Sequence, residues 1–119
     1  MNLEDYIGEY FKDVTLETCV EKSGISRPRV KPIDQFDQAV RVEFPRKLRE
    51  LFPIGTQYRA TVKVCQKSDK NGSPYGKPYL YASDIVLIAD TVPDKGLVAK
   101  VKAGTISGRS YIYDIEETF

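Results

Sequence analysis

Histidine is absent from the 119-residue sequence. Histidine titrates near neutral pH, and for that reason it is the commonest general base and a frequent metal ligand. Its absence excludes histidine-based catalytic triads and histidine metal sites. The glycine-containing turns at 71–73 and 104–108 also fit neither of the common nucleotide-binding fingerprints. Together these absences favour a binding protein over an enzyme.

Cysteine and long apolar segments are scarce as well. The two cysteines, Cys19 and Cys65, are far apart in the sequence and form neither a CxxC pair nor a disulfide framework. No apolar run approaches the ~18–20 residues that a membrane-spanning helix needs. Glu4 and Asp5 lie where a signal peptide would be basic. We therefore expect a cytoplasmic protein with reduced thiols, no metal, no cofactor and no membrane partner.

The clearest pattern in the chain predicts an antiparallel hairpin within residues 53–88. Apolar and polar residues alternate from 58 to 65, which is the period of a strand with one buried face. A turn-rich segment at 68–76 follows, and its Asn-Gly pair tolerates positive φ. The returning strand should bury Leu80 and Ala82 and expose Tyr79 and Tyr81. It becomes continuously apolar at 85–88, as expected where a strand is covered on both faces.

The first 24 residues predict helices. Apolar side chains at positions 3, 6, 7, 10, 11 and 14 form one stripe at helical spacing, and Asn2 can cap the helix. A second short helix is predicted to begin at Thr15 and to stop at Gly24.

Residues 16–33 also resemble the turn of a bacterial helix-turn-helix protein. The resemblance is carried by the spacing of Val20, Gly24 and Val30. In that family the helix after the turn enters the major groove of DNA. Carried over by position, the resemblance implies DNA contacts from Ser26, Arg27 and Arg29. Pro32 would lie inside the recognition helix, where proline removes a hydrogen bond, so an extended linker is the competing interpretation.

The remaining pattern is mostly that of strands. We expect a connector at 28–38, strands at 40–44, 96–103 and 109–115, and one or two helical turns at 45–52. The predicted fold class is α+β, in one domain spanning 1–119. A helical N-terminal segment at 1–24 would precede a mostly β region at 39–116. That region would form a strongly bent antiparallel sheet or a small five-stranded β-barrel.

Charge is distributed unevenly along the chain. Residues 1–22 carry a local net charge of −4, residues 27–77 one of +7, and residues 78–119 one of −2. A basic centre between acidic ends indicates either an anionic partner or self-complementary ends. A solvated basic face is the plainer alternative.

Tyrosines occur in pairs two residues apart, at Tyr79 and Tyr81 and at Tyr111 and Tyr113. We predict that each pair occupies one face of its strand. Aromatic rings on a basic β surface can stack on the bases of single-stranded nucleic acid while cations track its backbone. The candidate binding residues are Arg59, Lys63, Lys67, Lys70, Tyr75, Lys77, Tyr79, Tyr81, Tyr111 and Tyr113.

The tyrosines also allow interpretations that need no nucleic acid. Tyrosine is a good strand residue, and half-buried rings can be purely structural. The tyrosine faces or the N-terminal apolar stripe could instead be buried between two copies of the chain, which would make it a homodimer. Carboxylates such as Asp84, Asp90 and Asp94 could work in pairs, so an enzyme with an unrecognised site is a further alternative. The leading hypothesis is a non-enzymatic module that binds single-stranded nucleic acid.

Overall fold

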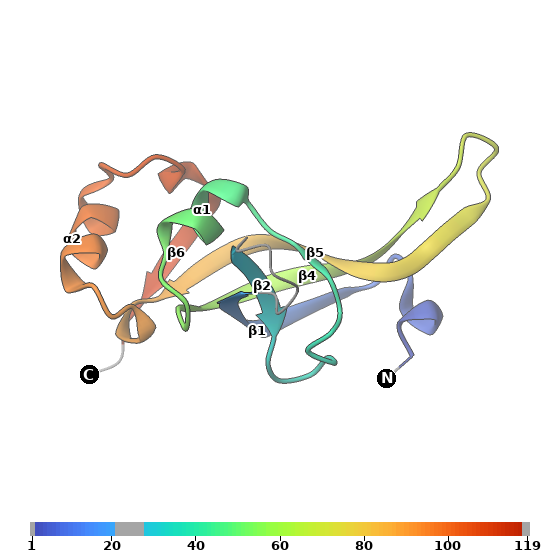
Figure 1. Ribbon diagram of the computed structural model, residues 1–119, viewed down its shortest axis with the longest axis horizontal. Coiled ribbons are helices and arrows are strands. Elements are labelled where there is room, and N and C mark those ends of the chain that lie inside the picture. The colour runs from blue at the N-terminus through green and yellow to red at the C-terminus, as the bar shows by residue number, and fades with distance from the viewer. Residues whose placement is uncertain (1, 21–27, 118–119) are drawn as a thin grey trace.

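The protein folds around one mixed sheet of six strands (Figure 1). The computed structural model describes residues 2–20 and 28–117. Its strand order is β2-β1-β4-β5-β3, and β6 also pairs with β5. The strands are β1 (Tyr10–Val20), β2 (Pro28–Pro32), β3 (Val42–Glu43), β4 (Gln57–Ser68), β5 (Pro74–Ile88) and β6 (Ile112–Glu116).

Helical structure is sparse and short. The α-helices are α1 (Arg46–Leu51) and α2 (Lys95–Ala103), and the 3₁₀ turns are η1 (Leu3–Tyr6), η2 (Ala89–Thr91) and η3 (Arg109–Tyr111). Within 2–20 and 28–117, none of these helices has the length and apolar character needed to cross a membrane.

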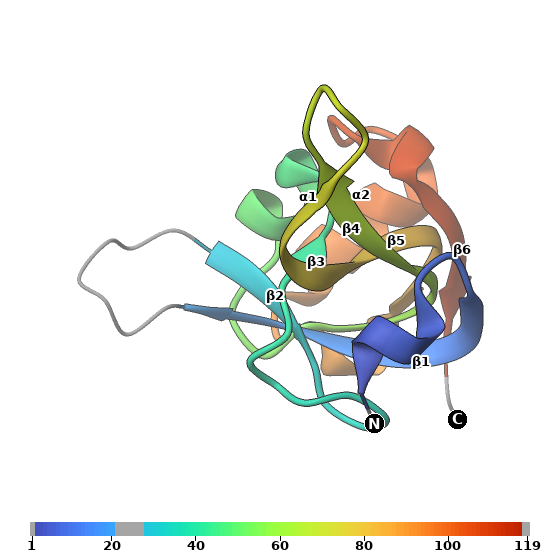
Figure 2. The same ribbon diagram turned by 90° about the vertical axis from the view of Figure 1, so that its right-hand side faces the viewer.

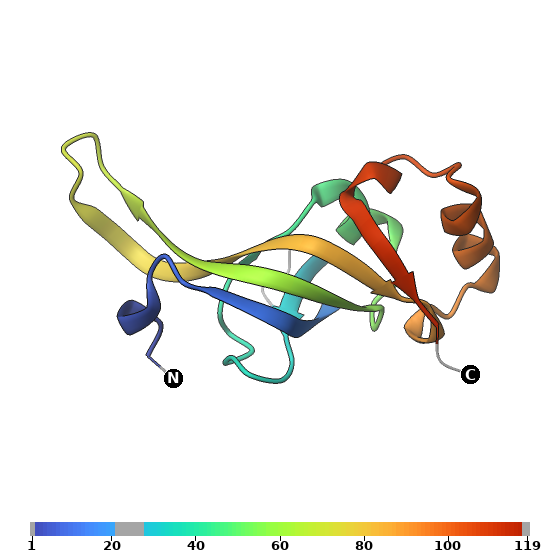
Figure 3. The same cartoon turned by 180° about the vertical axis from the view of Figure 1, so that it is seen from behind.

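The predicted hairpin is confirmed as β4 and β5, the longest strands of the sheet. Val62, Val64 and Leu80 have no exposed surface, as the alternation predicted. The turn is tighter than expected, because the Asp69 carboxylate accepts hydrogen bonds from the backbone N–H groups of Asn71 and Ser73, each at 2.9 Å. The hairpin tip projects well beyond the other strands as a two-stranded arm (Figures 1 and 3).

The predicted N-terminal helices are wrong. Among residues 2–20 only η1 is helical, and β1 occupies the segment from Tyr10 to Val20. Gly8 has φ +91° and Asp13 has φ +57°, values that no α-helix accommodates. Beyond this irregularity Val14, Leu16 and Thr18 are buried in alternation, which is the period of a strand.

The helix-turn-helix interpretation fails for the same reason. The residues before and after 21–27 are the antiparallel strands β1 and β2, with Val20 opposite Pro28 and Leu16 opposite Pro32. Both prolines are tolerated because β2 is an edge strand, where a missing N–H need not break a ladder. Arg29 lies on β2, whereas the other implied DNA contacts and Gly24 lie outside the described residues.

The strand predicted at 96–103 is wrong too, because this segment is α2. The Asp94 carboxylate caps its start by accepting a hydrogen bond from the Leu97 N–H (3.2 Å), and Gly104 ends it at φ +73°. Val98 and Val101, three residues apart on one helical face, are buried.

The sheet is neither wholly antiparallel nor closed into a barrel. β3 and β6 both run parallel to β5 and lie one after the other along the same strand, β3 at 80–81 and β6 at 85–88. The sheet curls until β2 approaches β3 (Figure 2). No ladder joins those two edges among the described strands. The count of strands is six rather than five, which completes the correction of the predicted fold class.

The core lies on the concave side of this curled sheet. Tyr58 is fully buried between Phe44 and Phe52, with ring centroids 4.7 and 5.9 Å away. Its hydroxyl is 3.0 Å from the Thr18 hydroxyl, and burial raises the pKa of Tyr58 far above its ordinary value. Leu48 of α1 packs into the same core. Because the sheet is not closed into a barrel, an opening remains, and α1 fills part of it.

Candidate functional site

The convex side of the sheet carries aromatic and basic side chains in register. Tyr10 of β1 lies opposite Lys63 of β4, and Lys63 lies opposite Tyr81 of β5. We call these three residues the outer row. Tyr10 and Tyr81 are 63% and 55% exposed, and the Lys63 ammonium lies 5.5 Å from the centre of the Tyr10 ring. Figure 3 shows β1, β4, β5 and β6 in front with no helix across them.

A second aromatic–cation contact lies beside the outer row. Tyr79 precedes Tyr81 by one alternation of β5, and the Arg41 guanidinium lies 5.7 Å from the centre of its ring. The backbone brings Arg41 beside β5, because the Leu80 N–H donates to the Arg41 carbonyl oxygen (2.9 Å) where β3 joins the sheet. Arg41 is also ion-paired with Glu43. Tyr79 and Tyr81 of β5 therefore each lie beside a cation, Arg41 and Lys63 respectively.

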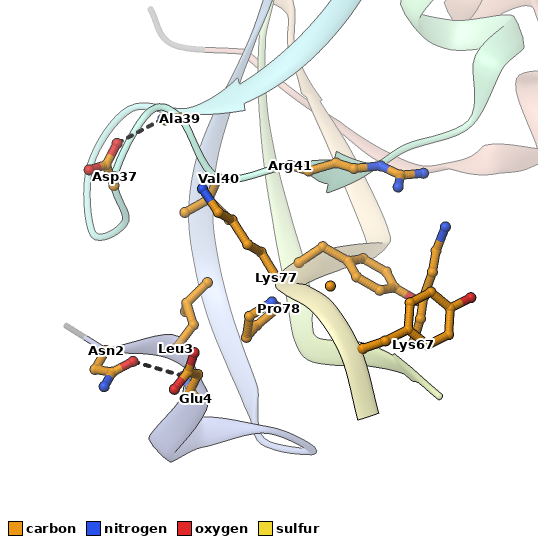
Figure 4. Close-up of a pocket in the computed structure, with 13 residues that line it drawn as sticks. Asn2, Leu3, Glu4, Asp37, Ala39, Val40, Arg41, Lys67, Lys77 and Pro78 are labelled. Atoms are coloured by element: carbon orange, nitrogen blue, oxygen red, sulfur yellow. Dashed lines mark hydrogen bonds between the residues drawn. The ribbon is translucent and has the colours of Figure 1, made fainter. Parts of the chain in front are cut away.

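A groove of about 620 Å³ opens between the base of the hairpin, the N-terminal segment and the loop at 37–41. Figure 4 shows Arg41 and Lys67 on one side and Asn2 and Glu4 on the other, with Lys77 between them. Four of the predicted binding residues line this groove, namely Lys67, Tyr75, Lys77 and Tyr79. Tyr75 belongs to β5 rather than to the turn that the sequence predicted at 68–76, and Lys77 lies on the returning strand.

The remaining predicted binding residues lie apart from this groove. Tyr81 and Tyr111 line a second hollow of about 430 Å³ between the end of β3 and the start of β6. Arg59 and Tyr113 line a third, of about 240 Å³. The Arg59 guanidinium donates to both carboxylate oxygens of Glu116, each at 3.1 Å, so its charge is locally neutralised. Lys70 lies exposed in the turn at the hairpin tip.

The sequence predicted that Tyr111 and Tyr113 share one face of a strand, and this prediction is wrong. Tyr111 belongs to η3, and only Tyr113 lies on β6. The two rings consequently line different hollows, although both are exposed. Tyr79 and Tyr81 do both lie on β5, and each has a neighbouring strand residue opposite it, Cys65 and Lys63 respectively.

Sequence reasoning missed two residues of this surface, Tyr10 and Arg41. Tyr10 fits the spacing of the predicted helical stripe as well as it fits a strand. The β-branched residues that follow it are the signal that favours the strand. Arg41 alternates with buried Val42, which indicates that it points outward. Nothing in the sequence pattern pairs it with Tyr79, because β3 and β5 are far apart in the chain.

The N-terminal apolar stripe is mostly packed against the core. Leu3, Tyr6 and Phe11 are partly buried against it, and the Phe11 ring meets the Tyr6 and Phe36 rings edge-on at 5.7 and 5.3 Å. Ile7 and Tyr10 are the residues of the stripe that stay exposed.

Comparison with protein-family models, curated proteins and solved structures gives no match for this chain. Residues 2–20 and 28–117 contain no group of three or more histidine, cysteine, aspartate or glutamate side chains placed to hold a metal ion. The candidate site is thus defined by its own geometry, which consists of exposed rings, neighbouring lysines and a groove.

Proposed function

We propose that the protein binds single-stranded nucleic acid along the convex side of β1, β4 and β5. The outer row carries this proposal, because it places a lysine between two exposed tyrosine rings on three adjacent strands. Successive bases can stack on Tyr10 and Tyr81 while Lys63 neutralises the phosphate between them. Neighbouring strands are ~4.8 Å apart, so the two rings are separated by ~10 Å, which leaves room for a backbone phosphate.

Single strands should bind better than duplexes. Bases in a duplex are already stacked on one another, so rings lying on a sheet face cannot stack on them without opening the pairs. The three-stranded face that carries the outer row is also broader than the α-helix or two-stranded ribbon that fits a major groove.

Fluorescence anisotropy with labelled single-stranded and duplex oligonucleotides, at ~50 and ~200 mM salt, tests the proposal. Lys63→Glu with Lys67→Glu should weaken binding to every sequence and flatten the salt dependence, because fewer counterions are released. Tyr79→Ala with Tyr81→Ala should weaken binding and leave the salt slope nearly unchanged.

A matched control is Lys47→Glu with Lys100→Glu. It makes the same charge change on α1 and α2, at the end of the molecule away from the hairpin tip (Figure 1), and its lysines form no ion pair within the described chain. The control should bind nearly as well as the wild type. If both double lysine variants lost the same affinity, the effect would come from net charge and not from the binding surface. If the protein bound neither oligonucleotide at low salt, the proposal would be wrong.

Self-association is the second candidate, because the exposed rings of Tyr10, Tyr81, Tyr111 and Tyr113 are also suited to a protein interface. Light scattering at several concentrations separates the two. A monomer at all concentrations would count against self-association, whereas a dimer that Tyr81→Ala dissociates would support it.

A further inference from the structure

The groove at the base of the hairpin has a basic side with Arg41 and Lys67 and an acidic side with Glu4, and Lys77 lies between them (Figure 4). Arg41, Lys67 and Lys77 line it together with Glu4 and Asp37. We infer that this groove holds a single nucleotide, with its phosphate between Lys67 and Lys77 and its base against Tyr79. The inference deepens the proposed function and rests on it, because it assigns a specific part of the bound strand to a specific place.

The two lysines are available to a phosphate. Lys67 comes from β4 and Lys77 from β5, so they approach the groove from different strands. Neither forms an ion pair with any residue in the described part of the chain. Figure 4 shows the two side chains extending toward opposite sides of the groove. Both are exposed, so each can turn inward and donate a charge-assisted hydrogen bond to a phosphate between them.

The aromatic side chains provide a place for a base. The Arg41 guanidinium lies 5.7 Å from the centre of the Tyr79 ring, which is half-buried and so held in position. Tyr75, which lies opposite Lys67 across the hairpin, is 53% exposed and lines the same groove. A planar base can therefore stack on a positioned ring while a second ring closes on it.

The acidic side orients the ligand. Glu4 repels a phosphate and can accept hydrogen bonds from the amino group of a base or the hydroxyl of a sugar. Asp37 is less available, since its carboxylate already accepts a hydrogen bond from the Ala39 N–H (2.8 Å). A nucleotide has an anionic end and a hydrogen-bond-donating end, so it matches both sides of the groove. The volume, about 620 Å³, is that of an ordinary small-molecule site.

The test is an NMR titration of the ¹⁵N-labelled protein with AMP and CMP, with adenosine and inorganic phosphate as partial ligands. Both mononucleotides should shift the amide signals of Lys67, Lys77 and Tyr79 in a saturable way. Each partial ligand should bind at least ~10-fold more weakly, because it lacks either the charged hydrogen bonds or the stacking contact. Phosphate that binds as tightly as AMP would reduce the groove to a general anion site and overturn the inference.

Variants separate this inference from the proposed function. Lys77→Glu should weaken AMP binding at least ~10-fold by removing one charged partner of the phosphate. Lys100→Glu makes the same charge change on α2, outside the groove, and it should leave AMP binding unchanged. Saturable AMP binding without oligonucleotide binding would support the nucleotide site in the groove and contradict the binding role of the outer row. Oligonucleotide binding without any AMP-induced shift at millimolar AMP would support the binding role of the outer row and overturn the inference about the groove. Lys77 is exposed, so an unchanged melting temperature should confirm that its variant folds.

Discussion

Tyr10→Ala and Tyr81→Ala should weaken single-strand binding by similar factors. Both rings flank Lys63 on adjacent strands and are similarly exposed. Stacking of one base on one ring contributes ~1–3 kcal/mol, so each variant should lose roughly 5- to 150-fold in affinity. The rings are ~10 Å apart and share no partner base, so the two losses should add in the double variant, to ~2–6 kcal/mol.

The assay is fluorescence anisotropy with one labelled oligonucleotide, repeated over a series of salt concentrations. The slope of log affinity against log salt should stay constant in both tyrosine variants. Lys63→Ala should instead reduce that slope by ~0.7, the value for one phosphate of a single strand. Tyr10→Phe and Tyr81→Phe are matched controls that keep the aromatic ring and should bind nearly as the wild type does.

One result would refute the outer row directly. If Tyr10→Ala kept full affinity while Tyr81→Ala lost it, the nucleic acid would not cross from β5 to β1. The bound strand would then follow the hairpin toward the groove without using the register between β1 and β4. Unchanged affinity in both variants would leave no stacking role for this surface. Both side chains are exposed, so stability should change by less than ~0.5 kcal/mol and should not confuse the comparison.

Three further predictions concern the fold. Leu80→Ala and Val62→Ala should each lower the free energy of unfolding by roughly 2–4 kcal/mol, because both side chains are fully buried. Urea denaturation measures this change. Near-neutral effects would contradict the register of the hairpin. Asp94→Ala should cost about 1 kcal/mol in the same assay by removing the cap of α2, and an unchanged midpoint would mean that the cap is not formed in solution. Folding raises the pKa of Tyr58, so its contribution to stability is present below the ordinary pKa of 10.0 and is lost as the pH rises above it. Tyr58→Phe should therefore show a shallower loss of stability between pH ~9 and ~11 than the wild type, and equal slopes would contradict the burial of an ionisable hydroxyl.

The hairpin could be predicted from the sequence because its information is local. Alternation from 58 to 65 defines which residues face the core, and the Asp69–Ser73 turn contains the residues that reverse a chain. The alternation and the turn each depend only on residues that are close together in the sequence. The same local patterns place Tyr79 and Tyr81 on one strand and Lys63 on the strand beside it, so they predict part of the outer row.

Short apolar patterns are ambiguous where they fit two periods. The stripe from Leu3 to Val14 matches a helix, yet β1 forms because pairing with β2 and β4 satisfies its backbone on both sides. The segment 96–103 matches a strand, yet it becomes α2. Its cap residues Asp94 and Gly104 are visible in the sequence, and they indicate a helix better than its apolar residues do.

Local sequence patterns are enough to specify the hairpin, the alternating burial of its strands and the excess of cations near it. Contacts between distant segments come from the folded chain instead. Tyr10 lies in register with Lys63 and Tyr81, Arg41 contacts Tyr79, and Lys67 and Lys77 line a groove with Glu4. The physical reason is that a residue's periodicity specifies which face it occupies but not which strand lies beside it. Pairing between distant segments depends on the packing of the whole core, and a parallel partner such as β3 on β5 leaves no local sign in either strand.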